Sequence, residues 1–160
     1  MLAMRPIDME RDWEMLASFH RDLFEISFGS TQEFSAERYR SLLADRLARW
    51  PEGQRLAIAG DEVAGQVELL TRAYEGRTVG FLSVLYLTPP YRGRGLGEEL
   101  LRYAYHVFLR YGVDECHLHV TERNARALSF YERHGFARIA PPETERGSWR
   151  MALCLAASEQ

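Results

Sequence analysis

The sequence predicts an α+β fold in which helices flank a mixed β-sheet. Residues 54–60 and 62–71 form an antiparallel hairpin across Gly60-Asp61, a dipeptide that favours a two-residue turn. A strand–turn–helix unit over Thr78–Arg110 follows, and its helix leads to a further apolar strand at 115–120. A helical crossover joins parallel strands, so the sheet combines antiparallel and parallel pairs.

The whole chain, residues 1–160, is long enough to bury one core without disulfides or metals, and we expect a single domain. A net charge of −3 and a pI near 6.0 argue against general nucleic-acid binding. The sequence has no bilayer-length apolar run and no basic-then-apolar leader. We therefore expect a cytoplasmic protein without a membrane partner. Cys116 and Cys154 show no metal spacing and are expected to be buried free thiols.

The N-terminal part predicts a short strand near Met4–Ile7 and then two helices. Apolar residues at helical spacing place the first helix from about Glu10 to Phe28 and the second at roughly Ser35–Ala48. Four aromatic residues surround the connection between them: Phe24, Phe28, Phe34 and Tyr39. We expect core packing for these rings, and the alternative is that they line a substrate pocket.

The chain is organised around Thr78–Arg110. Thr78–Leu87 is an apolar run that predicts a strand buried on both faces, and Pro89-Pro90 ends it. Apolar residues repeat at helical spacing from Gly97 to Arg110, so a helix begins directly after a glycine-rich turn. The turn contains three glycines and two arginines: Arg92, Gly93, Arg94, Gly95 and Gly97.

This turn predicts an anion site. Glycine lets the backbone approach a ligand closely, and the first N–H groups of a helix lack intrahelical partners at its positive end. The two arginines add mobile charges with phosphate-matching geometry. No lysine or hydroxyl follows as a Walker loop requires, and Glu98 stands where a dinucleotide-binding loop has its third glycine.

The last part of the chain predicts two strands and a helix between them. In the strand 115–120, Cys116, Leu118 and Val120 face one side, and Glu115, His117 and His119 face the other. A helix starts at Asn124 and ends at Gly135-Phe136. Residues 137–140 and 148–155, joined by Pro-Pro-Glu-Thr-Glu-Arg-Gly, predict a closing hairpin.

Two motifs resemble the GCN5-related N-acetyltransferase (GNAT) superfamily. Arg92-x-x-Gly95-x-Gly97 resembles the family's acetyl-CoA pyrophosphate loop. The run from Asn124 to Phe136, with Ala127, Tyr131 and Gly135 between, resembles its second motif, N-x-x-A-x-x-x-Y-x-x-x-G-F. Both occur in the family's order, within Thr78–Phe136.

The resemblance implies a three-layer α/β/α fold whose central strand splays from the next strand, with pantetheine lying in the gap. It implies acetyl-CoA as co-substrate, an amine acceptor and no metal. Backbone groups of Leu85, Tyr86 and Leu87 would bind the cofactor arm. The amides of Arg92, Gly93, Arg94, Gly95, Leu96 and Gly97 would bind the pyrophosphate, and Asn124 would bind the pantetheine or phosphate side.

The resemblance also implies the catalytic groups. Tyr131 matches the general acid that protonates the leaving thiolate. The central strand carries no acidic residue. His119 occupies the position at which some family members have a Glu that acts as the catalytic base, so His119 is the expected base. Glu68 and water remain alternatives.

The implied function is acetyl transfer from acetyl-CoA to a primary amine of a small molecule or a protein N-terminus by direct attack. The alternative is a non-catalytic CoA-binding sensor or regulatory module. The acceptor stays open, and so does a homodimer. Acidic residues in the predicted loops, Glu75, Glu143 and Glu145, could favour a cationic acceptor.

Overall fold

The computed structural model describes residues 1–142 and 147–155, and its strands form one seven-stranded sheet in the order β1-β2-β3-β4-β5-β7-β6. The strands are β1 (Ala3–Pro6), β2 (Gln54–Ala59), β3 (Glu62–Tyr74), β4 (Arg77–Leu87), β5 (Glu115–Thr121), β6 (Ala137–Ala140) and β7 (Ser148–Cys154). The β4–β5 pair is parallel and the other neighbouring pairs are antiparallel. The predicted mixed sheet is confirmed.

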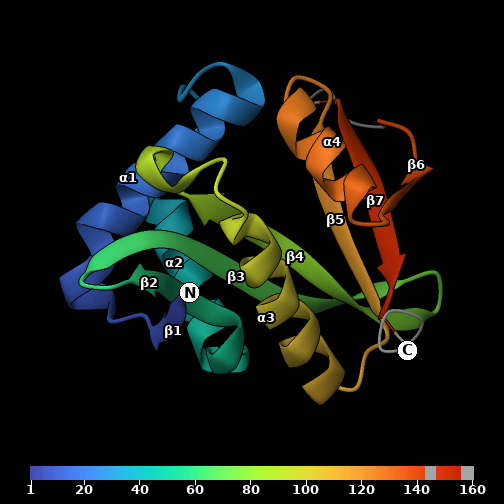
Figure 1. Cartoon of the computed structure of the whole chain (residues 1–160), viewed down its shortest axis with the longest axis horizontal. Coiled ribbons are helices and arrows are strands. Elements are labelled where there is room, and N and C mark those ends of the chain that lie inside the picture. The colour runs from blue at the N-terminus through green and yellow to red at the C-terminus, as the bar shows by residue number, and fades with distance from the viewer. Residues whose placement is uncertain (143–146, 156–160) are drawn as a thin grey trace.

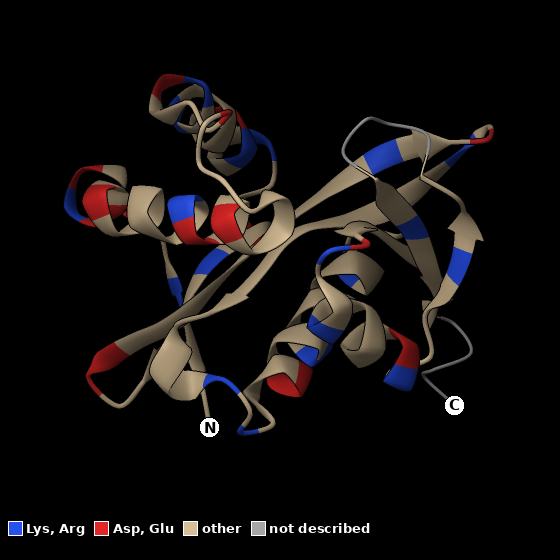
Figure 2. Cartoon of the chain, turned by 90° about the horizontal axis from the view of Figure 1, so that it is seen from above, with Lys and Arg blue, Asp and Glu red and all other residues tan. Residues whose placement is uncertain are grey.

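Four α-helices cover the sheet: α1 (Met9–Phe28), α2 (Ala36–Arg49), α3 (Leu96–Arg110) and α4 (Ala125–Arg133). Helices α1 and α2 lie on one face, and α3 and α4 lie on the other, which gives the three layers that the resemblance implied (Figures 1 and 2). Short polar side chains start the helices locally. Asp8 accepts hydrogen bonds from the Glu10 and Arg11 amides at the start of α1, and Ser35 accepts one from the Arg38 amide at the start of α2.

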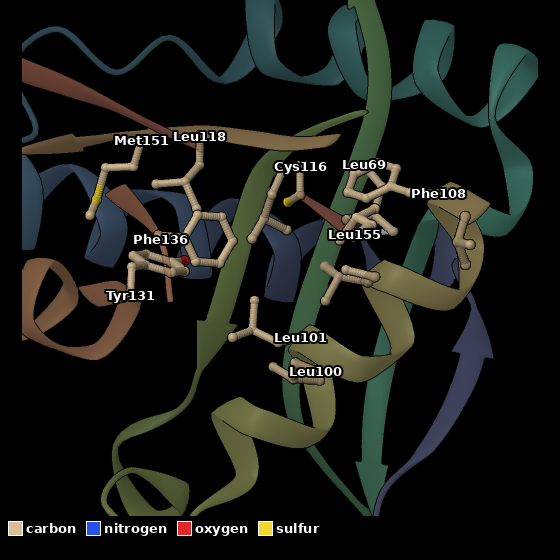
Figure 3. Close-up of a cluster of buried hydrophobic side chains, with 14 of the residues drawn as sticks. Leu69, Leu100, Leu101, Phe108, Cys116, Leu118, Tyr131, Phe136, Met151 and Leu155 are labelled. Carbon is tan, nitrogen blue, oxygen red and sulfur yellow. The ribbon is translucent and has the colours of Figure 1, made fainter. Parts of the chain in front are cut away.

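Each face of the sheet has its own apolar core. On the α3 and α4 side, Leu100, Leu101 and Phe108 pack against Cys116 and Leu118 of β5 (Figure 3). On the other side, residues of α1 and α2 pack against β2 and β4. The predicted alternation along β5 is confirmed for its apolar side, since Cys116, Leu118 and Val120 are all buried on the α3 side.

Two local expectations were wrong. Glu75 was expected in a loop over Arg72–Arg77 that leads to the central strand. Instead, β3 and β4 extend to a two-residue turn at Glu75-Gly76, where both φ angles are positive (47° and 79°) as a tight hairpin turn requires. Cys154 is exposed near the end of its strand, whereas Cys116 is buried as expected. Glu143 and Glu145 lie outside the described residues. Among the helices of residues 1–142 and 147–155, none is long and apolar enough to cross a membrane.

The central feature of the sheet is the divergence of β4 from β5. The two strands pair only at Gly80↔Cys116 and Phe81↔His117, whereas β4 stays paired with β3 as far as Leu87 (Figure 1). Gly80 lies where the two strands begin to diverge. A Cβ at this position would come within 2.6 Å of the Phe108 ring, so the packing of α3 requires glycine there. Beyond Phe81, the backbone groups of β4 that point away from β3 are not paired with β5. The implied central splay is confirmed.

Candidate active site

The glycine-rich turn leaves open space at the start of α3. Gly93 and Gly95 have φ angles of 73° and 78°, and a Cβ at either position would meet no described atom within 4 Å. Gly95 is the N-cap residue of α3 and no side chain caps the helix there. The first amides of a 15-residue helix therefore face this space, as an anion site requires.

Gly97 serves packing in addition. A Cβ on Gly97 would lie 2.9 Å from the Phe130 ring, so the glycine allows α4 to approach the first turn of α3. The sequence pattern assigned Gly93, Gly95 and Gly97 to ligand binding alone, whereas in the structure Gly97 also makes room for helix packing.

Arg92 is held in place, contrary to the expected mobile charge. Its Nε donates to the Leu87 carbonyl oxygen at 2.8 Å, and its Nη2 lies 2.7 Å from Asp22 Oδ2 on α1. The Tyr86 hydroxyl also donates to Asp22. Partial burial opposes ionisation of Asp22, but these two donors outweigh it and keep the pKa of Asp22 below its usual value. Arg94 is exposed and donates only to the Pro90 carbonyl oxygen at 3.2 Å in the described part of the chain.

Asn124 is the N-cap residue of α4. Its Oδ1 accepts a hydrogen bond from the Ala127 amide at 3.2 Å, so the side chain starts the helix that carries Tyr131. The oxygen is used within the protein, which leaves the Asn124 side-chain NH₂ group for a ligand.

Tyr131 lies on the α3 and α4 side of the sheet, packed between the rings of Phe130 and Phe136 at centroid distances of 5.2 Å and 5.3 Å. The residue is 8% exposed. Figure 3 shows the ring directed from α4 toward β4. Burial raises the pKa of Tyr131, so the phenol keeps its proton at neutral pH.

A cavity of about 1300 Å³ opens on the opposite face, under α1 and α2. Its wall includes the diverging parts of both central strands, with Ser83 and Val84 from β4 and His119 and Thr121 from β5. The four aromatic residues between the helices also line it: Phe24, Phe28, Phe34 and Tyr39. The rings therefore line a cavity, and Tyr39 and Phe34 also pack with the core as expected; that the cavity receives a substrate stays a prediction.

His119 is exposed to this cavity, across from Arg150 of β7. Partial burial lowers the pKa of His119, and the positive charges of Arg150 and Arg72 lower it further. The imidazole is therefore neutral at pH 7 and has a lone pair available. Its neighbour His117 is fully buried instead, with Nε2 at 3.1 Å from Glu115 and Nδ1 accepting from Arg150 Nε at 2.9 Å.

Glu68, the second candidate base, is fully buried in a hydrogen-bond network. Arg46 and Tyr39 donate to its two oxygens at 2.6 Å and 2.7 Å, and Gln66 Nε2 donates at 2.7 Å. His20 Nε2 lies 3.6 Å away and stacks on Tyr39. Both oxygens of Glu68 thus accept hydrogen bonds from neighbouring side chains, which suits a structural role.

Sequence reasoning missed Asp22, Arg46 and Arg150. Each acts through a partner at least 22 positions away, so no local pattern identified them. A buried acid such as Glu68 does signal that cations or donors must surround it, but not which ones. No cluster of three or more His, Cys, Asp or Glu that could hold a metal occurs in residues 1–142 and 147–155.

Comparison with known proteins agrees with this geometry. The model of the acetyltransferase (GNAT) family matches residues 13–136. N-alpha-acetyltransferase 30 of Schizosaccharomyces pombe is 33% identical over 91 residues, which is 56% of this chain and 61% of the relative. Thialysine N-epsilon-acetyltransferase of Bos taurus is 29% identical over 111 residues, 69% of this chain and 61% of the relative. The chain thus matches about three fifths of the length of these two relatives.

The fold has close counterparts among solved structures. PaiA N-acetyltransferase from Thermoplasma acidophilum, in complex with coenzyme A, superimposes with a TM-score of 0.73 at 23% identity, over 96% of this chain and 99% of that one. The family model matches more than half of the chain, including the glycine-rich turn, the splayed strands and α4. The chain belongs to the acetyltransferase (GNAT) family.

Proposed function

We propose that this chain is an N-acetyltransferase that moves an acetyl group from acetyl-CoA to a primary amine by direct attack. The observation that carries the proposal is the gap between β4 and β5. On one face it meets the cavity with His119, on the other it meets Tyr131, and β4 ends at the open glycine-rich turn. The thioester, the acceptor amine and the CoA phosphates can thus each reach the gap between β4 and β5 from a different side.

The residues present fit the co-substrate. The amides around Gly93–Gly97 would hold the pyrophosphate, and the unpaired edge of Leu85, Tyr86 and Leu87 would hydrogen-bond the pantetheine arm. Asp22 fixes Arg92 close to the turn and offsets part of its charge, so the backbone amides carry most of the proposed phosphate binding. Asn124 would donate from its side-chain NH₂ group.

In the proposed reaction, the neutral amine nitrogen attacks the acetyl carbon and the C–S bond breaks. His119 takes a proton from the amine, directly or through water, and the buried Tyr131 gives its proton to the leaving thiolate. The lowered pKa of His119 and the raised pKa of Tyr131 set each group in the protonation state that its step needs at pH 7. The products are the N-acetylated amine and CoA.

The test of the function is the release of CoA thiol from acetyl-CoA, measured with and without a panel of amines. We expect release that depends on the amine and an acetylated product by mass spectrometry. The chain contains no lysine, so it offers no lysine side chain as a competing acceptor. If CoA binds but no amine in a broad panel is acetylated, the non-catalytic CoA-binding module replaces this proposal.

The first prediction concerns the proposed phosphate site. Gly95→Asp would add a carboxylate among the phosphate-binding amides and strain a residue with φ of 78°. We expect the Kd for CoA, measured by calorimetry, to rise by about 100-fold, equivalent to about 3 kcal/mol.

Gly76→Asp is its matched control. Gly76 has a φ of 79°, equally open surroundings and a place in the β3–β4 turn, so it carries the same backbone strain away from the phosphate site. We expect a folded variant with wild-type CoA affinity. Equal affinities of the Gly95 and Gly76 variants would contradict the phosphate assignment.

The base makes the second prediction. Since only the neutral imidazole accepts a proton, kcat/KM should fall as the pH drops through the pKa of His119. Partial burial, Arg150, Arg72 and the neighbouring His117 all lower this pKa, so the fall should lie below the ordinary 6.5. His119→Gln should remove this inflection and lower the rate at pH 7.

An acceptor of known pKa, used with both proteins, separates the titration of the amine from that of the enzyme. Identical rates and pH profiles for wild type and His119→Gln would leave water as the proton acceptor, since Glu68 is held by its donors.

The relatives bear names that state two kinds of amine, N-alpha and N-epsilon. A primary amine is what these names share, and we adopt it for this chain. A homodimer and a cytoplasmic location stay predictions.

A further inference from the structure

The cavity is lined by an arginine, Arg150, that has no carboxylate partner in the described part of the chain. Arg150 lines the cavity beside His119, and in residues 1–142 and 147–155 no carboxylate lies within ion-pair distance of it. Its Nε is used by His117 at 2.9 Å, and its Nη1 is 3.5 Å from His119 Nε2. Its Nη2 is buried and has no hydrogen-bond partner.

The nearby carboxylates have other cationic partners. Glu75, whose charge reaches Arg150 without an ion pair, lies 3.8 Å from Arg77. Glu115 is bound by Arg77 at 2.5 Å and 2.9 Å and by His117, and these contacts lower the pKa of Glu115 to about 2. Glu68 is bound by Arg46. The Tyr74 ring lies 3.9 Å from the Arg150 guanidinium carbon, which offsets part of the cost of burial but accepts none of its N–H bonds.

A second arginine adds to the positive electrostatic potential near Arg150. Arg72 of β3 lies over the Phe81 ring at 3.9 Å, and Arg150 lies 5.7 Å from the same ring. Arg72 has no carboxylate partner among the described residues either. In Figure 2, blue positions lie along the strands at the right-hand end of the sheet, whereas the helices at the left carry both red and blue positions.

This positive region is separate from the site for the CoA phosphates. Along β4, Phe81 and Leu87 are six residues apart, which corresponds to about 20 Å of extended strand. The glycine-rich turn lies beyond Leu87. An anion at Arg150 must therefore belong to the acceptor side of the site.

We propose that Arg150, with Arg72 nearby, forms a carboxylate-binding subsite, so that the acceptor is an amine with a carboxylate close to it, as in an amino acid. The proposal rests on the proposed function, since it assigns the substrate class of the same site. The guanidinium group is a preferred partner for a carboxylate, and its Nη1 lies on the side of the exposed His119. Because Arg150 Nη1 is 3.5 Å from His119 Nε2, a carboxylate on Arg150 holds the attached amine near the base.

The same contact has a consequence for the base. A bound carboxylate offsets the charges of Arg150 and Arg72, which are the two arginines that lower the pKa of His119. The pKa of His119 should rise on acceptor binding, which makes the imidazole a stronger base when an acceptor is present.

The kinetic test compares acids with their own amides as acceptors: glycine, β-alanine and glutamate against the corresponding carboxamides. Peptides with an acidic or neutral second residue form a separate arm, which distinguishes a free amino acid from an acidic peptide. We expect wild type to prefer the acid in kcat/KM by about tenfold or more, after correction for the pKa of each amine. This comparison needs no variant.

Arg150→Gln should reduce the acid-to-amide ratio to near one, whatever its effect on the rate with amides. Arg138→Gln is the matched control, because Arg138 lies on the neighbouring β6, is exposed and pairs with Glu132. We expect it to keep the wild-type ratio.

A binding measurement separates failure of this subsite from failure of the proposed activity. The NMR signal of the His119 ring is assigned by its loss in His119→Gln. Its pH titration is then followed in the presence of CoA, once without and once with N-acetylglycine, a carboxylate that cannot be acetylated further. We expect the carboxylate to raise the pKa of His119 in wild type and not in Arg150→Gln. If the carboxylate leaves the titration unchanged, or if amides are acetylated as well as acids, the subsite does not exist. A shift without any turnover would support the subsite and contradict the acetyltransferase activity.

Discussion

Replacing Tyr131 by Phe should lower kcat by about two to four orders of magnitude while the fold and CoA affinity stay unchanged. The hydroxyl is the only group that the substitution removes. The apolar packing of the ring against Phe130 and Phe136 remains. Presteady-state measurement of acetyl transfer is the appropriate assay, because slow product release would mask a loss in the chemical step.

Tyr111→Phe is the control for removal of a buried hydroxyl. Tyr111 follows the other end of α3, and its hydroxyl is buried without a hydrogen-bond partner in the described structure. We expect this variant to keep the wild-type rate. If Tyr131→Phe transfers acetyl as fast as wild type, Tyr131 is a core residue and the thiolate leaves with another proton donor.

Arg46→Met should produce the largest loss of stability. Arg46 and Glu68 are 5% and 0% exposed, and Arg46 Nη1 donates to Glu68 at 2.6 Å. Without the arginine, the carboxylate stays buried with only neutral donors. Breaking such a pair costs about 3 to 5 kcal/mol of the free energy of unfolding. Urea denaturation measures the difference, and the m-value shows whether the folded state is the same.

Arg49→Met gives the surface comparison on the same helix. Arg49 pairs with Asp45 at 3.4 Å, and the two side chains are 62% and 55% exposed. An exposed pair of this kind contributes less than about 1 kcal/mol. Similar losses for Arg46→Met and Arg49→Met would show that water reaches Glu68 and that the network is not sealed.

The elements around the candidate site could be predicted from sequence because their signals are local. Apolar spacing identified the helix after Gly97, and Pro89-Pro90 with the glycines marked the turn before it. The position of Asn124 ahead of an apolar helix reflects N-cap chemistry, which the structure confirms at 3.2 Å. The β3–β4 turn was missed because Glu75 carries a positive φ, which is uncommon for a residue other than glycine.

The sequence alone determined the order of strands and helices, the glycine-rich turn and the family motifs, because each depends on residues close together in the chain. Only the tertiary structure decided which charged side chains are paired within the protein and which of them face the cavity. Asp22 reaches Arg92 across 70 positions, Arg46 reaches Glu68 across 22, and Arg150 reaches His117 across 33. These pairings depend on how the helices and the diverging strands pack in three dimensions, and they leave His119 and Arg150 facing the cavity while Glu68 is enclosed.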